Sequence, residues 1–174
     1  MAVTVAIVDN VQFTADTLSD LFEAATVQGN AATQGVLPSA PGLNTLAVSG
    51  TATPIDVASG WAFVKGYLVQ NSAAMTVAIP TPVTSTRIDR IIIRLALDGS
   101  PVTASIVRLA GAEGGAAPTL TQTTSTFELS LAQVSIVITT GVCTVTDERG
   151  YMGQMTKKFL VSATDGWNST DGTN

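Results

Sequence analysis

The chain has 174 residues, of which 45% are hydrophobic but only 12% are charged, and its formal net charge is −5. Ordinary soluble domains carry about 25% charged residues. A negative chain whose only adjacent basic residues are Lys157 and Lys158 lacks the cationic surface that phosphate neutralisation needs, so we expect no nucleic-acid partner. A surface so poor in charge favours association. We expect a homo-oligomer, with a trimer as the first expectation, whereas the alternative is a neutral, Thr-rich β surface.

The residue types that most active sites need are scarce. There is no histidine and one cysteine, Cys143, which removes the commonest general base, the Ser-His and Cys-His pairs, thiolate metal sites and an intrachain disulfide. Asp147 and Glu148 are the only adjacent acids, and neighbours on a strand point to opposite faces, which disfavours a paired-carboxylate hydrolase. Asp165 and Asp171 only weakly resemble a calcium loop. We therefore expect no enzyme activity, no cofactor and no metal.

Neither a leader nor a membrane span is expected. The start, Met1 to Val5, has no basic segment ahead of its apolar residues. The stretch 129–146 carries no charge but is interrupted by Ser, Thr, Gln and Gly, so it predicts a hairpin and no membrane insertion.

The N-terminal part, residues 1–42, is predicted to be an arm. Residues 3–8 predict a short strand or extended segment, and residues 14–25 predict a helix that Thr14 or Asp16 can cap. Residues 29–42 are rich in turn formers and predict a loop that ends the arm. The helix has one apolar stripe, made of Leu18, Leu21, Phe22 and Ala25. This stripe either packs on the chain's own core or docks on a neighbouring subunit.

Residues 43–150 are predicted to be a β domain, followed by a C-terminal tail or connection over residues 151–174. Apolar and polar residues alternate along most of this part, as in strands with one buried face. The predicted strands are 46–48, 57–69, 75–79, 87–97, 102–109, 127–131, 134–138 and 142–146. A change of phase at Leu131–Ala132 predicts a β-bulge. The fold class is mainly β: an antiparallel β-sandwich-like domain with a short N-terminal helix and an extended arm.

Two short motifs place an acid and a base on the same side of a strand. They are Arg87-x-Asp89 and Asp147-x-Arg149, at the two ends of the central run of strands. If these strands are neighbours, Arg87 meets Asp147 while Asp89 meets Arg149. Such bidentate pairs are geometrically specific and would fix the register of the strands. The alternative is four separate, solvated charges.

The order of motifs along residues 35–149 resembles the structural proteins of tailed-bacteriophage tails: baseplate, upper-baseplate and minor tail proteins that carry fibres or receptor-binding proteins. The motifs are Gly35-Val36, Leu46-x-Val48, Val57-x-x-Gly60-x-Ala62-x-Val64-x-Gly66, Arg87-Ile88-Asp89-x-Ile91, the loop to Pro118, Glu128-Leu129-x-Leu131-Ala132-x-Val134, Gly141 and Asp147-x-Arg149.

The resemblance implies a virion component of the tail or baseplate, made in the cytoplasm of the host bacterium, whose β domain is a platform for other tail or baseplate proteins. It supplies no catalytic residues. Few residues follow Arg149, which favours a connector for fibres over a receptor-binding head. Two alternatives stay open. One is a carbohydrate- or host-surface-binding module that stacks sugars on Trp61, Tyr67 and Trp167, and the other is a capsid decoration or head-fibre protein.

Overall fold

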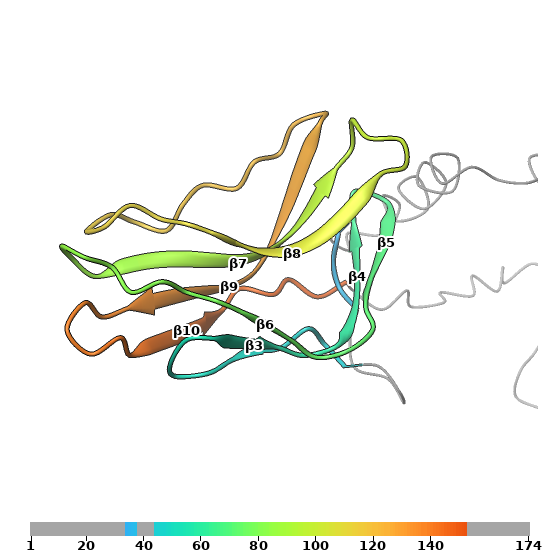
Figure 1. Ribbon diagram of the computed structural model, residues 1–174. Coiled ribbons are helices and arrows are strands. Elements are labelled where there is room, and N and C mark those ends of the chain that lie inside the picture. The colour runs from blue at the N-terminus through green and yellow to red at the C-terminus, as the bar shows by residue number, and fades with distance from the viewer. Residues whose placement is uncertain (1–33, 38–43, 153–174) are drawn as a thin grey trace, which may run out of the picture.

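The computed structural model describes residues 34–37 and 44–152, which form antiparallel β-sheets and, within these ranges, no helix (Figure 1). The predicted helix 14–25, the segment 3–8 and most of the tail, including Trp167, lie outside the described residues. The strands are β1 (Gly35–Val36), β2 (Val48–Ser49), β3 (Ile55–Val57), β4 (Gly60–Val64), β5 (Tyr67–Asn71), β6 (Met75–Val77), β7 (Arg87–Ala96), β8 (Thr103–Leu109), β9 (Thr126–Ile136) and β10 (Cys143–Asp147).

The central sheet has four strands in the order β10-β9-β7-β8, all antiparallel to their neighbours. Its two inner strands are the longest of the described chain, with 10 residues in β7 and 11 in β9. The predicted hairpin of residues 87–109 is confirmed, because Leu95 pairs with Ala104 across a short turn. The predicted hairpin around residues 139–141 is confirmed as well, since β9 and β10 pair directly.

The predicted bulge is also confirmed. Ile91 pairs with Ala132, but Ile92 pairs with Ser130, so Leu131 is the extra residue of β9. Before the bulge the odd-numbered residues Phe127 and Leu129 point toward the core, and after it the even-numbered residues Val134 and Ile136 do. The two predicted strands 127–131 and 134–138 are therefore one strand, because the bulge keeps both of its halves apolar toward the same side.

Two three-stranded sheets flank the central one, in the orders β1-β4-β5 and β2-β3-β6. The segment 57–69, predicted as one strand, is divided among β3, β4 and β5. A turn at Lys65 and Gly66, with φ of 46° and 80°, separates β4 from β5. Both residues have the left-handed conformation that two-residue hairpin turns require. Strand β1 pairs with β4, although its two residues belong to the predicted loop 29–42.

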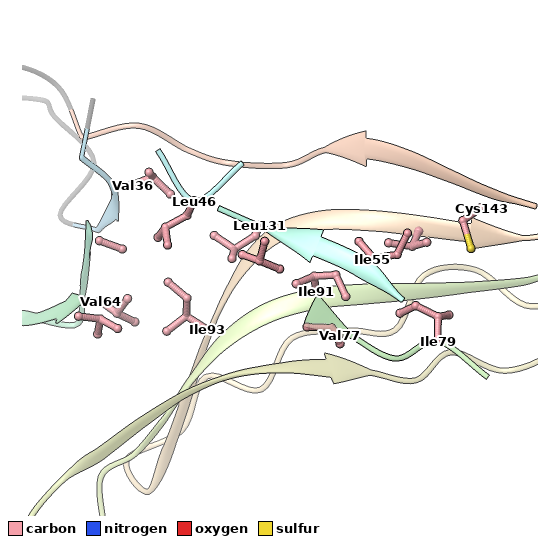
Figure 2. Packing of buried hydrophobic residues seen from close by; sticks show 14 of the residues in the cluster. Val36, Leu46, Ile55, Val64, Val77, Ile79, Ile91, Ile93, Leu131 and Cys143 are labelled. Carbon is pink, nitrogen blue, oxygen red and sulfur yellow. The ribbon is translucent and has the colours of Figure 1, made fainter. Parts of the chain in front are cut away.

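Residues from all three sheets share one hydrophobic core (Figure 2). Val64 of β4, Ile55 of β3 and Ile91 of β7 are each completely buried in it. Burying an aliphatic side chain of this size stabilises the fold by about 1.5–3 kcal/mol. Burial of the apolar residues at alternate strand positions therefore holds the three sheets together.

The opposite face of the central sheet is in contact with the long connection between β8 and β9. Ile92 points to this face and is completely buried, outside the shared core cluster. The carbonyl of Pro118 accepts a hydrogen bond from Arg90, and the amide of Thr121 donates one to Glu128 at 2.7 Å. Polar groups on the sheet thus fix the course of this connection.

Candidate functional site: the ion-pair clusters of the central sheet

All five arginines of the sequence form ion pairs with carboxylates inside the described part of the chain. The pairs are Arg87–Asp89, Arg108–Asp89, Arg90–Glu148, Arg94–Glu128 and Arg149–Asp147. The pairs divide between the two faces of the central sheet. They determine which of its carboxylates are occupied by internal hydrogen bonds.

The cluster on the core side is built around Asp89, whose side chain is completely buried. Arg87 donates to both of its oxygens, from Nε at 2.8 Å and from a terminal nitrogen at 3.0 Å. Arg108 of β8 donates at 2.9 Å, and so does the amide of Gly111. Four hydrogen bonds occupy the four lone-pair positions of the carboxylate. Asp89 therefore ties β7 to β8 and to the start of the β8–β9 connection.

The four residues of the two predicted motifs are paired, but not with the expected partners. Arg87 binds Asp89 within β7, and Arg149 binds Asp147 at 2.7 Å within its own motif. The expected pairs between the first and last strands do not form, because β9 lies between β7 and β10. Strand order, which the two motifs do not encode, decided the pairing.

Arg149 links the end of β10 to the segment before β2. Its guanidinium donates to the carbonyl and to the hydroxyl oxygen of Thr45, each at 2.8 Å, and lies 5.4 Å from the centre of the Tyr151 ring. The hydrogen bond to Asp147 raises the pKa of Arg149, and the same bond lowers the pKa of Asp147 to about 2. The pair closes the two ends of the β domain onto each other.

A second saturated carboxylate, Glu148, lies on the outer side of the sheet. It accepts hydrogen bonds from Arg90 at 2.9 and 3.1 Å, from Ser130 at 2.6 Å and from Gln133. Burial alone would raise the pKa of Glu148, but the bonds from Arg90, Ser130 and Gln133 outweigh burial and lower it. The sequence analysis did not single out Glu148 as a member of such a cluster.

Arg94 and Glu128 form the third cluster, on the same outer face. Arg94 donates from Nε at 2.8 Å, and the Glu128 side chain is almost completely buried. A sequence signal for both outer clusters existed, because Arg90 and Arg94 alternate with the apolar residues of β7. This face of the strand was expected to be solvated, so its charged residues gave no reason to look for partners. The alternation of apolar and polar residues does not reveal that the β8–β9 connection covers this face.

Glu113 fixes the loop that precedes β7. Its carboxylate accepts the amides of Val83 at 2.7 Å, Thr84 at 2.6 Å and Ser85 at 3.2 Å, together with the Thr84 hydroxyl. The hydrogen bond from that hydroxyl, followed by those from the Val83 and Thr84 amides, lowers the pKa of Glu113 to about 2. The acid stands in the glycine-rich stretch 111–118, where the sequence predicts only a loop.

This arrangement holds strands together and offers little to a substrate. Asp89 and Glu148 each accept four hydrogen bonds, two on each oxygen, so their lone pairs are already used by the protein. Within residues 34–37 and 44–152 no three His, Cys, Asp or Glu residues gather as metal ligands. Burial raises the pKa of the Cys143 thiol, as does the negative charge of Asp89, which disfavours a reactive thiolate.

A groove of about 280 Å³ lies between the edge strands β5 and β8. Its lining residues are uncharged: Leu68, Val69, Gln70, Asn71, Met75, Ala104, Ser105 and Ile106. The aromatic residues considered for sugar stacking are not brought together there. Trp61 lies on the outer face of β4, whereas Tyr67 pairs with the inward-pointing Val64 and packs against the core.

No protein-family model matches the sequence, and no curated protein or solved structure is significantly similar to the chain. Among the described residues, no helix is both long enough and apolar enough to cross a membrane.

Proposed function

We propose that the chain is a virion structural protein of a bacteriophage tail or baseplate, without enzymatic activity. Its β domain, organised as a β-sandwich-like unit, acts as an assembly platform or connector for fibres or receptor-binding proteins. The order of sequence motifs over residues 35–149 supports this proposal. So does the use of the ionic groups, which stabilise the fold and leave Asp89 and Glu148 little capacity for chemistry.

The observation that carries the proposal is the saturation of Asp89 and Glu148 on opposite faces of one sheet. A catalytic acid or base must exchange a proton with a substrate within hydrogen-bond reach. Each of these carboxylates instead accepts four hydrogen bonds from its own chain. Such a network suits a scaffold that must keep its shape while other proteins bind to it.

The partners follow from the same reasoning. The arginines are committed to internal pairs, so the surface of residues 34–37 and 44–152 is poor in charge, and surfaces poor in charge favour association between subunits. We infer a homo-oligomer, with a trimer as the first expectation, bound to other tail or baseplate proteins. The protein is made in the bacterial cytoplasm and resides in the virion.

Immunogold electron microscopy tests the location directly. An antibody is raised against the purified chain and applied to purified particles of the phage that encodes it. We expect gold at the tail tip or baseplate. Gold on the capsid would instead favour the decoration or head-fibre alternative, and unlabelled particles, with the chain present only in the host lysate, would contradict a virion role. Binding of the purified chain on a glycan array would favour the carbohydrate-binding alternative.

A further inference from the structure

The sheet β1-β4-β5 presents an apolar face to the outside. Ala62, Val64 and Val69 point inward to the shared core. The alternate residues Trp61, Phe63, Leu68 and Gln70 point the other way, and we name the three apolar ones, Trp61, Phe63 and Leu68, the outer face. Trp61 and Phe63 are half-buried, while the side chain of Leu68 is 51% exposed. An apolar sheet face is stable when another element packs on it.

The chain itself supplies a segment that fits this face. Gln34 directly precedes β1, so residues 1–33 reach the fold at an edge of this same sheet. These residues contain the apolar stripe Leu18, Leu21, Phe22 and Ala25. We propose that the stripe of residues 14–25 docks, in the same chain, on the outer face formed by Trp61, Phe63 and Leu68.

The chemistry of the two surfaces agrees. In the helix predicted from the sequence, the stripe residues share one face, whereas Asp16, Asp20 and Glu23 fall on the opposite side. Docking therefore leaves the three acids in water and brings only apolar side chains to the sheet. A helix as short as the predicted one, about three turns, is marginal in isolation, and contact with an apolar surface stabilises such a helix.

The length of the connecting chain favours the same molecule over a second copy. About nine residues join Ala25 to Gln34 and span up to about 30 Å when extended. Three neighbouring strands extend over only about 10 Å. A tether this short gives the segment an effective local concentration in the millimolar range, which exceeds the concentration of free copies in ordinary solutions.

Trp61 is a built-in reporter of this contact. The test uses the full chain with Trp167→Phe, which leaves Trp61 as the single tryptophan. Leu21→Ser combined with Phe22→Ser removes half of the stripe, and Asp20→Ser combined with Glu23→Ser is the matched control on the other side. We expect the stripe variant to shift the Trp61 emission to longer wavelength and to increase its quenching by acrylamide. The control should leave both unchanged, and equal emission and quenching in all three proteins would overturn the proposal.

A disulfide trap identifies which chain provides the stripe. Phe22→Cys and Leu68→Cys are combined with Cys143→Ala, so the only cysteines are the two that are introduced. We expect oxidation to give a monomer with faster migration in a non-reducing gel. A disulfide-linked dimer would overturn docking within one chain. The fluorescence test does not depend on replacing the buried Cys143, so it decides the contact even where the trap variant fails to fold.

Discussion

At the scale of single residues, the protein uses its few charges inside the fold. Asp89 is fully buried, yet its charge is balanced by Arg87 and Arg108, both in direct contact. Removing one member of such a cluster leaves a buried charge without its counter-charge, which is strongly destabilising. Replacing the whole cluster by apolar residues of similar volume would cost much less. The pair Asp147–Arg149 has the same spacing along the chain, but its carboxylate partner, Asp147, remains in contact with water.

This difference predicts unequal costs for two equivalent substitutions. Asp89→Asn should lower the free energy of unfolding by about 3–5 kcal/mol, because it leaves two guanidinium groups without a counter-charge. Asp147→Asn, the matched control, should cost about 0–1 kcal/mol, because the Asp147 side chain is 53% exposed. Urea denaturation followed by circular dichroism measures both. Equal costs for the two variants would contradict the structural importance of the Asp89 cluster.

Glu113 predicts a dependence of stability on pH. The pKa of this group is lowered from 4.5 to about 2 in the folded chain. A lowered pKa means that the folded state holds the proton less strongly than the unfolded state does. The contribution of Glu113 is therefore complete above pH 4.5 and is lost as the pH falls toward about 2.

The stability difference between the wild type and Glu113→Gln should accordingly be constant above about pH 5 and shrink below it. Thermal unfolding at a series of pH values measures this difference. Asp147 titrates in a similar range but is present in both proteins, so its effect cancels. A difference that stays constant down to pH 2 would show that Glu113 does not act through its charge.

At the scale of elements, the β8–β9 connection shows how a loop can be fixed without regular structure. Gly111 lies near its start, and the amide of Gly111 donates a hydrogen bond to Asp89. A Cβ atom at this position would lie 2.0 Å from the carbonyl oxygen of Ile88, well inside any allowed contact. Glycine is therefore needed here for close approach to β7.

Gly111→Ala should destabilise the protein by about 1–3 kcal/mol, as overpacked sites do. Gly150→Ala is the control, because no atom lies within 4 Å of the position that its Cβ would occupy. The control should change stability by less than about 0.5 kcal/mol. Chemical denaturation compares the two variants. A neutral Gly111→Ala would mean that the connection does not pack against β7 as described.

At the scale of the whole molecule, low charge and open strand edges act together. β8 is an edge strand of the central sheet, and its one charged residue, Arg108, is turned toward Asp89. Edge strands of monomeric proteins are commonly protected by outward charges, which prevent pairing with other chains. β8 lacks this protection, which is in keeping with the proposal of a subunit that associates with copies of itself.

We expect light scattering after size exclusion to give the mass of an oligomer, and Ser105→Lys, at an exposed position of β8, to lower that mass. A lysine at an open edge opposes strand pairing and also charges the groove beside β5. Val83→Lys is the control, since Val83 is 82% exposed and lies in the loop before β7. A monomeric wild type would contradict the proposed homo-oligomer, and an equal effect of both lysines would point to net charge as the cause.

The sequence by itself determined where the strands of the central sheet lie, although it divided β9 in two, together with the two hairpins and the bulge at Leu131. These features depend on the alternation of neighbouring residues, which is local and can be read along the chain. It did not predict β3 as a separate strand, the participation of β1 in a sheet, or the partners of Arg87 and Asp147. Those features depend on which distant strands become neighbours, and alternation does not encode that order. Only the tertiary structure, by placing β9 between β7 and β10 and laying the β8–β9 connection over Arg90, decided where the charges meet.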